Sequence, residues 1–230
     1  MAKLSIIVPV YNERDTVARL LEQVLSLDID KEIIVVDDGS TDGTREVLTE
    51  CEREPISVIH HPENRGKGAA VRSGLERARG KYVIVQDADL EYDPNEIAGL
   101  MAPLEQGECD AVYGNRFPLA LKEGVHGVHI LIYVANLCLS YFLSVLFMRR
   151  IHDIETCYKI LRTDVAKSLG VRADGFDIEP EITAKLLKRG YRIKEIPISY
   201  RHRHYSEGKK ITWRDGITAL LTILKYRFID

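Results

Sequence analysis

Short apolar segments alternate with segments of helical spacing through the first half of the chain, and this alternation limits the possible folds more than any other feature. The expected strands are 4–8, 32–36, 56–59, 81–85 and 110–113, and the expected helices between them are 17–25, 41–52, 68–79 and 94–104. Strands that alternate with helices form a mostly parallel sheet with right-handed crossovers. The predicted fold class is therefore α/β, with a mostly parallel sheet flanked by helices.

Length and charge limit the number of domains and the kinds of partner that the chain can have. A chain of 230 residues suits one domain with a full core, which we divide into 1–116, 117–150 and 151–230. The 32 basic and 35 acidic residues nearly balance, so charge does not favour nucleic acid as a partner. The four cysteines lack CxxC spacing, and with no signal peptide expected at the start they are typical of reduced thiols in a cytoplasmic protein.

Acidic residues follow the expected strand at 81–85. Asp87 and Asp89 lie two positions apart at its carboxyl end, and ligands of open α/β sheets bind outside the carboxyl ends of the strands. Carboxylate oxygens suit Mg²⁺ or Mn²⁺, which proteins usually share with substrate phosphates. A solvated acidic turn is the alternative for this pair taken alone.

The common phosphate-binding loops are missing from the sequence. Neither GxxxxGK[ST] nor GxGxxG occurs, which disfavours a P-loop NTPase and a Rossmann dehydrogenase. Gly66 and Gly68 could still let the backbone approach a phosphate, with Arg65 and Lys67 supplying positive charge. A flexible entry to the next helix explains the two glycines equally well.

Four motifs of the first half occur together in a specific order. They are SIIVPVYNE, VVDDGSTDGT, NRGKGAAVRSG and QDADLEYDP. This half resembles the nucleotide-sugar-binding part of family 2 glycosyltransferases, which have the GT-A fold. The later segments GNRF, DIETCYKI, EPEI, RIKEIPISY and RHYSEGKK resemble the polyprenyl-phosphate branch of that family, which includes the dolichyl-phosphate mannose synthases.

The resemblance implies a role for particular residues. The metal ligands would be Asp87, Asp89 and Glu91, although mannose synthases commonly carry Gln at the last position. The donor site would be formed by Pro9, Tyr11, Glu13, Val36, Asp38, Lys67, Asp87, Ala88 and Asp89. The catalytic residues would be Asp89, Arg116, Arg203 and Lys209, of which the three cations would surround the donor and acceptor phosphates. Residues 37 and 38 could instead only cap the following helix, and 201–210 could be a solvated basic loop.

The segment 128–148 contains no charged residue and is long enough to be a transmembrane candidate. We reject a crossing because it would place Asp87 and the basic segment 201–210 on opposite sides of the bilayer. His129, Tyr133, Asn136, Ser140 and Ser144 instead form one polar stripe on a helix, which favours a helix lying in the membrane interface. Lys122, Arg149 and Arg150 would lie near anionic headgroups. A buried or dimer-forming helix is the alternative, so a homodimer is left open. An amphipathic helix is expected at 212–226.

These observations predict an inverting glycosyltransferase that moves a sugar from a nucleotide sugar, GDP-mannose or a UDP-hexose, to a polyprenyl phosphate. It would bind peripherally to the cytoplasmic face of the membrane. One alternative is transfer to a saccharide hydroxyl, which needs a carboxylate base such as Asp153, Glu179 or Glu181. A second alternative is a catalytically silent membrane adaptor that binds nucleotide sugars.

Overall fold

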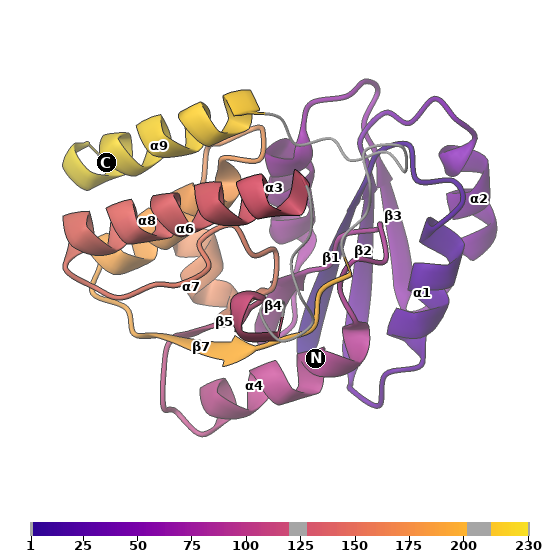
Figure 1. Cartoon of the computed structure of the whole chain (residues 1–230). Helices are drawn as coiled ribbons and strands as arrows, with labels where there is room; N and C mark the ends of the chain where they lie inside the picture. Colours follow the sequence, from indigo (N-terminus) through magenta and orange to yellow (C-terminus); the bar gives the residue numbers. More distant parts are fainter. Residues whose placement is uncertain (1, 120–127, 202–212, 230) are drawn as a thin grey trace.

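The computed structural model describes residues 2–119, 128–201 and 213–229 (Figure 1). Strands and helices alternate through the first half, as the sequence predicts. The strands are β1 (Leu4–Val10), β2 (Lys31–Asp37), β3 (Ile56–His60), β4 (Tyr82–Val85), β5 (Ala111–Asn115), β6 (Lys159–Arg162) and β7 (Ile193–Pro197). The helices are α1 (Val17–Leu25), α2 (Thr44–Cys51), α3 (Lys67–Arg77), the 3₁₀ turn η1 (Pro94–Glu96), α4 (Ile97–Glu105), α6 (Val128–Phe147), α7 (Thr163–Ser168), α8 (Ile178–Lys188) and α9 (Trp213–Phe228).

The strands form one seven-stranded sheet in the order β3-β2-β1-β4-β6-β5-β7. Strand β6 pairs antiparallel with both β4 and β5, and the other pairs are parallel. Sequence reasoning did not identify β6, which is only four residues long. The mostly parallel sheet is confirmed, and the sequence segment that leads into β6 lies next to the carboxyl end of β4.

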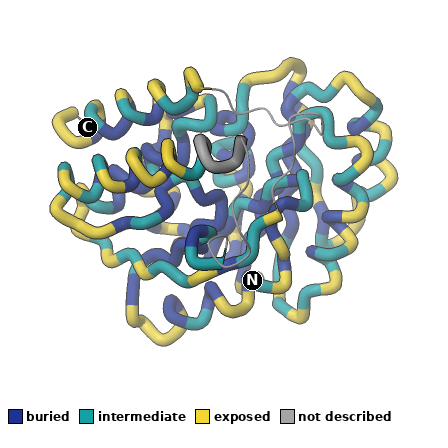
Figure 2. Tube along the Cα trace, viewed as in Figure 1, coloured by how far each residue is buried: buried dark blue, intermediate teal, exposed yellow. Residues whose placement is uncertain are grey.

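Alternating side chains of the central strands pack on opposite faces of the sheet. Ile6 and Val8 of β1 pack against α1, α2 and α4, whereas Ile7 packs against α3 with Ile34 and Val36 of β2. Both faces of these strands are therefore covered, which explains why they read as continuous apolar runs. In Figure 2 the central strands β1, β2 and β4 are mostly dark blue, the colour of buried residues.

Helices α6 and α9 pack beside each other outside this sheet (Figure 1). A third apolar cluster joins them, with Leu143 of α6 and Ile223 of α9 fully buried. Among the residues that the structure describes, no helix is long and apolar enough to cross a membrane.

Three residues of the polar stripe of α6, Asn136, Ser140 and Ser144, face the protein rather than its surroundings. Asn136 and Ser140 are buried, and Ser144 bonds to the backbone of Ile151. The outward face of the helix carries apolar side chains, among them Tyr141 and Val145. The predicted helix is thus confirmed over 128–147, whereas Asn136, Ser140 and Ser144 make internal contacts.

Candidate active site

A cavity of about 330 Å³ lies at the carboxyl ends of β1 and β4. Its lining contains most of the residues that the sequence singled out. These are Pro9, Tyr11, Glu13, Asp38, Lys67, Asp87, Ala88, Asp89, Glu91 and Arg116. Segments distant in sequence complete it with Glu155, Cys157, Phe176, Glu179 and Tyr200. The parallel sheet therefore gathers these polar groups at one edge, as the strand pattern implied.

Asp87 is paired with a cation from the first residue of α3. The Lys67 ammonium lies 2.7 Å from Asp87 Oδ1 and 2.9 Å from Oδ2, with Glu179 at 3.8 Å. Burial alone would lower the pKa of Lys67, but the charge of Asp87 raises it well above its ordinary value. Lys67 therefore stays protonated and brings a fixed positive charge to the first acidic residue of the cavity.

The remaining two predicted metal ligands differ in their surroundings. Asp89 lines the cavity and accepts a hydrogen bond from the Glu91 amide at 3.1 Å. The Glu91 carboxylate is buried and accepts a hydrogen bond from the Tyr200 hydroxyl. Within the described part of the chain, no three acidic, histidine or cysteine side chains are grouped to hold a metal. Asp87 and Asp89 nevertheless supply the hard oxygen donors that suit Mg²⁺ or Mn²⁺ when a ligand completes the shell.

Asp38 holds the loop that carries Lys67. Its carboxylate accepts hydrogen bonds from the Arg65 amide at 3.0 Å and the Gly66 amide at 2.7 Å, and it lies 2.6 Å from His61 Nδ1. Asp37 is also engaged internally, with Arg45 and the Ser40 amide. Asp38 lines the cavity, so it positions the loop at the same place where the donor was predicted to bind.

The two glycines of the loop pack against the backbone of another segment. A Cβ atom added at Gly66 would lie 2.3 Å from the Asp174 carbonyl oxygen, and one at Gly68 would lie 2.2 Å from the Ala173 carbonyl oxygen. The Gly68 amide donates to the Asp174 carbonyl at 2.7 Å. The Gly68 and Ala69 amides in the first turn of α3 are therefore used internally, whereas Lys67 lines the cavity.

We expect Gly68→Ala to lower the free energy of unfolding by about 1–3 kcal/mol, the usual cost of forcing extra volume into a packed site. Gly99→Ala is the matched control, because Gly99 lies in α4 with no atom within 4 Å of an added Cβ. The control should leave the free energy of unfolding unchanged or raise it, since alanine is a better helix former than glycine. Chemical denaturation measures both variants, and equal effects would show that the packing against Ala173 is not tight.

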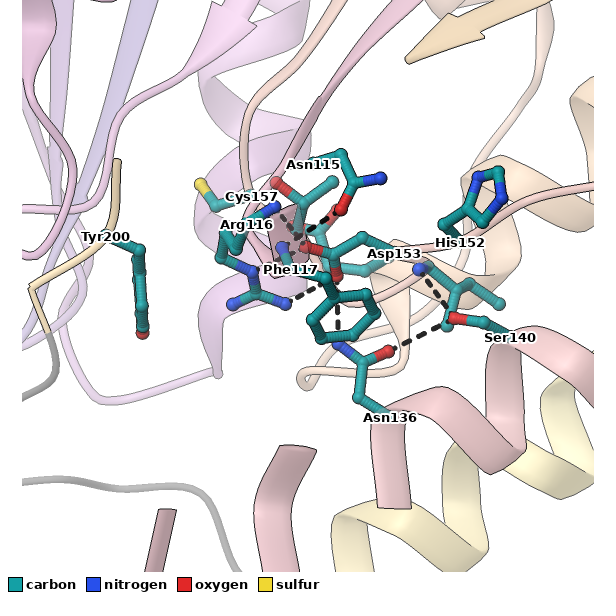
Figure 3. Close-up of polar contacts among 12 residues, drawn as sticks. Asn115, Arg116, Phe117, Asn136, Ser140, His152, Asp153, Cys157 and Tyr200 are labelled. Carbon is teal, nitrogen blue, oxygen red and sulfur yellow. Dashed lines mark hydrogen bonds and ion pairs between the residues drawn. The ribbon is translucent and has the colours of Figure 1, made fainter. Parts of the chain in front are cut away.

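Arg116, which lines the cavity, forms a buried ion pair with Asp153 (Figure 3). The guanidinium binds both carboxylate oxygens, at 2.7 and 2.8 Å, and it lies over the Tyr200 ring at 4.9 Å. Asn136 of α6 donates to the same carboxylate at 2.8 Å. Although burial would raise the pKa of Asp153, the charge and hydrogen bonds of Arg116 hold that pKa below its ordinary value.

The three carboxylates proposed as a base for a hydroxyl acceptor differ in their partners and in their access to the cavity. Asp153 is neutralised by Arg116, and Glu181 accepts bonds from Arg172, Ala173 and Lys185. Glu179 lines the cavity but is paired with buried Lys159. Of the three proposed bases, only Glu179 therefore reaches the cavity.

Glu155 is a cavity residue that sequence reasoning missed. It lies in the loop before β6, and its Oε1 is buried with no hydrogen-bond partner among the described residues. Burial raises the pKa of this carboxyl to about 7, against the opposing charge of Lys159. The signal available in the sequence was an additional acidic residue two positions after Asp153.

One predicted donor-site residue lies elsewhere, and two predicted catalytic residues are not described. Val36 is fully buried in the core beside Ile34 and is not part of the cavity lining. Arg203 and Lys209 lie outside the residues that the structure describes. Their predicted roles remain predictions.

Residues 5–170 match the sequence profile of glycosyl transferase family 2. The chain belongs to this family. Its membership confirms the predicted glycosyltransferase class, and the sheet with its flanking helices is the fold expected of that class.

Similar proteins include two curated relatives. A dodecaprenyl-phosphate galacturonate synthase of Rhizobium johnstonii is 28% identical over 90% of this chain and 61% of its own length. A low-salt glycan biosynthesis hexosyltransferase, Agl6, of Haloferax volcanii is 28% identical over 93% of this chain and 51% of its own. The chain thus spans only about half to three fifths of these two relatives.

A solved structure shares the fold over the whole chain. Glucosyl-3-phosphoglycerate synthase of Mycobacterium tuberculosis, in complex with Mn²⁺, uridine diphosphate and phosphoglyceric acid, superimposes with a TM-score of 0.74 at 20% identity. The match covers 100% of this chain and 80% of that one. It confirms the predicted GT-A-like fold.

Proposed function

We propose that this chain transfers a sugar, with inversion, from a nucleotide sugar to a polyprenyl phosphate at the cytoplasmic face of a membrane. The observation that carries the proposal is the placement of α6. Its inner face bonds through Asn136 to the Asp153–Arg116 pair of the cavity, and its outer face is apolar and exposed. One helix therefore connects the site that suits phosphates with a surface that suits lipid.

On the donor side, the residues suit a nucleoside diphosphate. The base and ribose would lie against Pro9, Tyr11 and Glu13, and the diphosphate would lie near Lys67. Asp87 and Asp89 would hold Mg²⁺ or Mn²⁺, which supplies positive charge to the diphosphate when bound. The solved relative with Mn²⁺ and uridine diphosphate supports a divalent ion in this fold.

On the acceptor side, a phosphate needs positioning more than deprotonation. A phosphate monoester has a second pKa near ~6, so it is largely dianionic at neutral pH. Its oxygen would attack the anomeric carbon as the bond to the diphosphate breaks, and the nucleoside diphosphate would leave. Arg116 lines the cavity and, with Arg203 and Lys209, would position the phosphate. The name of the galacturonate synthase supports a prenyl phosphate as acceptor.

The exposed apolar side chains support a lipid surface as partner. Among the described residues, every exposed large apolar side chain lies on α6, on α9 or directly after one of them. We call this set the apolar face: Val134, Leu137, Tyr141, Val145, Met148, Trp213, Ile217, Leu221, Phe228 and Ile229. Exposed Arg149, Arg150, Arg214 and Arg227 adjoin it. Cations beside an apolar surface favour the anionic leaflet on the cytoplasmic side.

We expect the protein to bind vesicles containing phosphatidylserine, and the double variant Val145→Glu with Leu221→Glu to bind at least about 100-fold more weakly. Both side chains are more than half exposed, at 60% and 59%, so the fold should tolerate the change. Each replacement removes about 1.5–3 kcal/mol of the binding free energy, which comes from burying the apolar side chain in the lipid. Thr49→Glu is the control, because Thr49 is an exposed residue of α2. Vesicle sedimentation measures binding, and unchanged binding of the double variant would remove the apolar face from the proposal.

The proposed reaction is tested by incubating the protein with a panel of nucleotide sugars, Mg²⁺ or Mn²⁺ and vesicles that carry a polyprenyl phosphate. A lipid-linked sugar formed from one donor supports the proposal. Binding of a nucleotide sugar without transfer to any acceptor would favour the silent adaptor instead.

A further inference from the structure

The order of the strands arranges the cavity in three parts. Asp38 and Tyr11 lie at the β2 and β1 side, Asp87 follows β4, and residues 155–157 lead into β6. The strand order is β2-β1-β4-β6, so these parts follow one another across the sheet edge. A nucleotide sugar is also linear, with the sugar beyond the diphosphate. A donor with its base near β1 and its diphosphate near Asp87 therefore places its sugar beside the segment that carries Glu155.

The backbone on both sides of Glu155 is tightly anchored. The Ile154 amide donates to Ser140 at 3.1 Å, and the Cys157 amide donates to the Tyr92 hydroxyl at 3.0 Å. Buried Lys159 donates to the carbonyls of Ile154 and Thr156. The loop is thus held from α6, from the chain after β4 and from β6, and it fixes where the Glu155 side chain begins.

The Glu155 carboxyl itself is not satisfied by this scaffold. Its Oε1 is buried and has no hydrogen-bond partner among the described residues, although the side chain lines the cavity. A buried carboxyl oxygen without a partner costs free energy, so a fold keeps one mainly where a ligand supplies the missing hydrogen bond. The nearby charges of Lys159, Glu179, Arg116 and Asp153 largely pair with one another, as Lys159–Glu179 and Arg116–Asp153.

We propose that Glu155 binds the hydroxyl groups of the transferred sugar and thereby contributes to the choice of sugar. This inference rests on the proposed function. A sugar hydroxyl can donate to Oε1 and fill the missing contact. The neighbouring carboxylate of Glu179 is already paired with Lys159, which leaves Glu155 as the better sugar ligand.

The test compares the affinity for a nucleotide sugar with that for its nucleoside diphosphate. Calorimetry with Mg²⁺ would use UDP with UDP-glucose and UDP-galacturonate, and GDP with GDP-mannose. For the pair that wild type binds, Glu155→Ala should weaken binding of the nucleotide sugar at least about 10-fold, since a hydrogen bond to a charged group contributes about 1.5–3 kcal/mol. The nucleoside diphosphate should bind as before. Glu155→Gln should lose less affinity for the nucleotide sugar, because the amide oxygen can still accept a hydrogen bond.

Glu76→Gln on the exposed side of α3 is the control and should change neither affinity. Thermal unfolding of each variant checks the fold, and Glu155→Gln keeps the shape of the side chain should Glu155→Ala prove unstable. The role of Glu155 would be overturned if the variant lost equal affinity for the nucleoside diphosphate and the nucleotide sugar. It would also be overturned if the variant lost affinity for neither. A loss of transfer to a hydroxyl acceptor with unchanged affinity for the nucleotide sugar would make Glu155 a base and overturn the inference. Failure of wild type to bind any of these donors would overturn the proposed function itself.

Discussion

Replacing Asp89 with alanine should abolish sugar transfer while the protein remains folded. Asp89 lies in the cavity lining and in the loop after β4 rather than in the core. If it holds the divalent ion, its loss removes several kcal/mol of charge stabilisation from the reaction, which corresponds to a rate about 10³-fold lower. Initial rates of nucleoside diphosphate release measure the effect.

Two controls accompany this variant. Asp28→Ala removes an exposed carboxylate outside the cavity lining and should leave the rate unchanged. A chelator should reduce the rate of wild type to that of Asp89→Ala. Added Mn²⁺ should restore the rate of wild type but not that of the variant. Full activity of Asp89→Ala in excess chelator would contradict a metal-dependent mechanism.

Replacing Asp153 with asparagine should cost about 3–5 kcal/mol of the free energy of unfolding, because it leaves Arg116 without its buried partner. Asp153 is fully buried and bonds to both Arg116 and Asn136. The matched control is Asp164→Asn in the exposed pair of Arg162 and Asp164, whose side chains are 57% and 65% exposed. That change should cost about 1 kcal/mol or less. Urea denaturation compares the two variants.

The effect at Asp153 should also depend on pH. Its pKa is lowered in the folded protein, so its charge stabilises the fold above the ordinary pKa of an aspartate, about 4. This stabilisation is lost as the pH falls through the lower pKa of the folded state. The difference in the free energy of unfolding between wild type and Asp153→Asn should therefore be largest near neutral pH and become smaller in strong acid. A difference that grows toward low pH would contradict the buried ion pair.

The periodicity of the first half was sufficient to predict the mostly parallel sheet and the edge at which the cavity lies. Alternating strands and helices favour one mostly parallel sheet, and one sheet brings Tyr11, Asp38 and Asp87 to the same edge. These relations depend on short-range patterns and on topology rules, which a single sequence contains. The antiparallel β6 escaped because it is short and because its partners β4 and β5 lie far from it in sequence.

The roles of individual polar residues were harder to predict, because they depend on partners distant in the chain. The stripe of Asn136 and Ser140 indicated a helix with two faces, but not that Asp153 and Ile154 would meet the polar one. Gly66 and Gly68 suggested a phosphate loop, whereas both are required by the backbone at Ala173 and Asp174. Glu155 resembled any other acidic loop residue until the cavity and its missing partner were visible.

The most direct test of the central claim compares acceptors that differ in one chemical group. Vesicles would carry the same prenyl chain either as its phosphate monoester or as its free alcohol, and a soluble saccharide would serve as a third acceptor. A donor labelled in the sugar is supplied with Mn²⁺, and the product is identified by mass. We expect label only on the prenyl phosphate, as a phosphodiester-linked sugar, with release of one nucleoside diphosphate for each sugar transferred. Label on the alcohol or the saccharide, and none on the phosphate, would contradict the account.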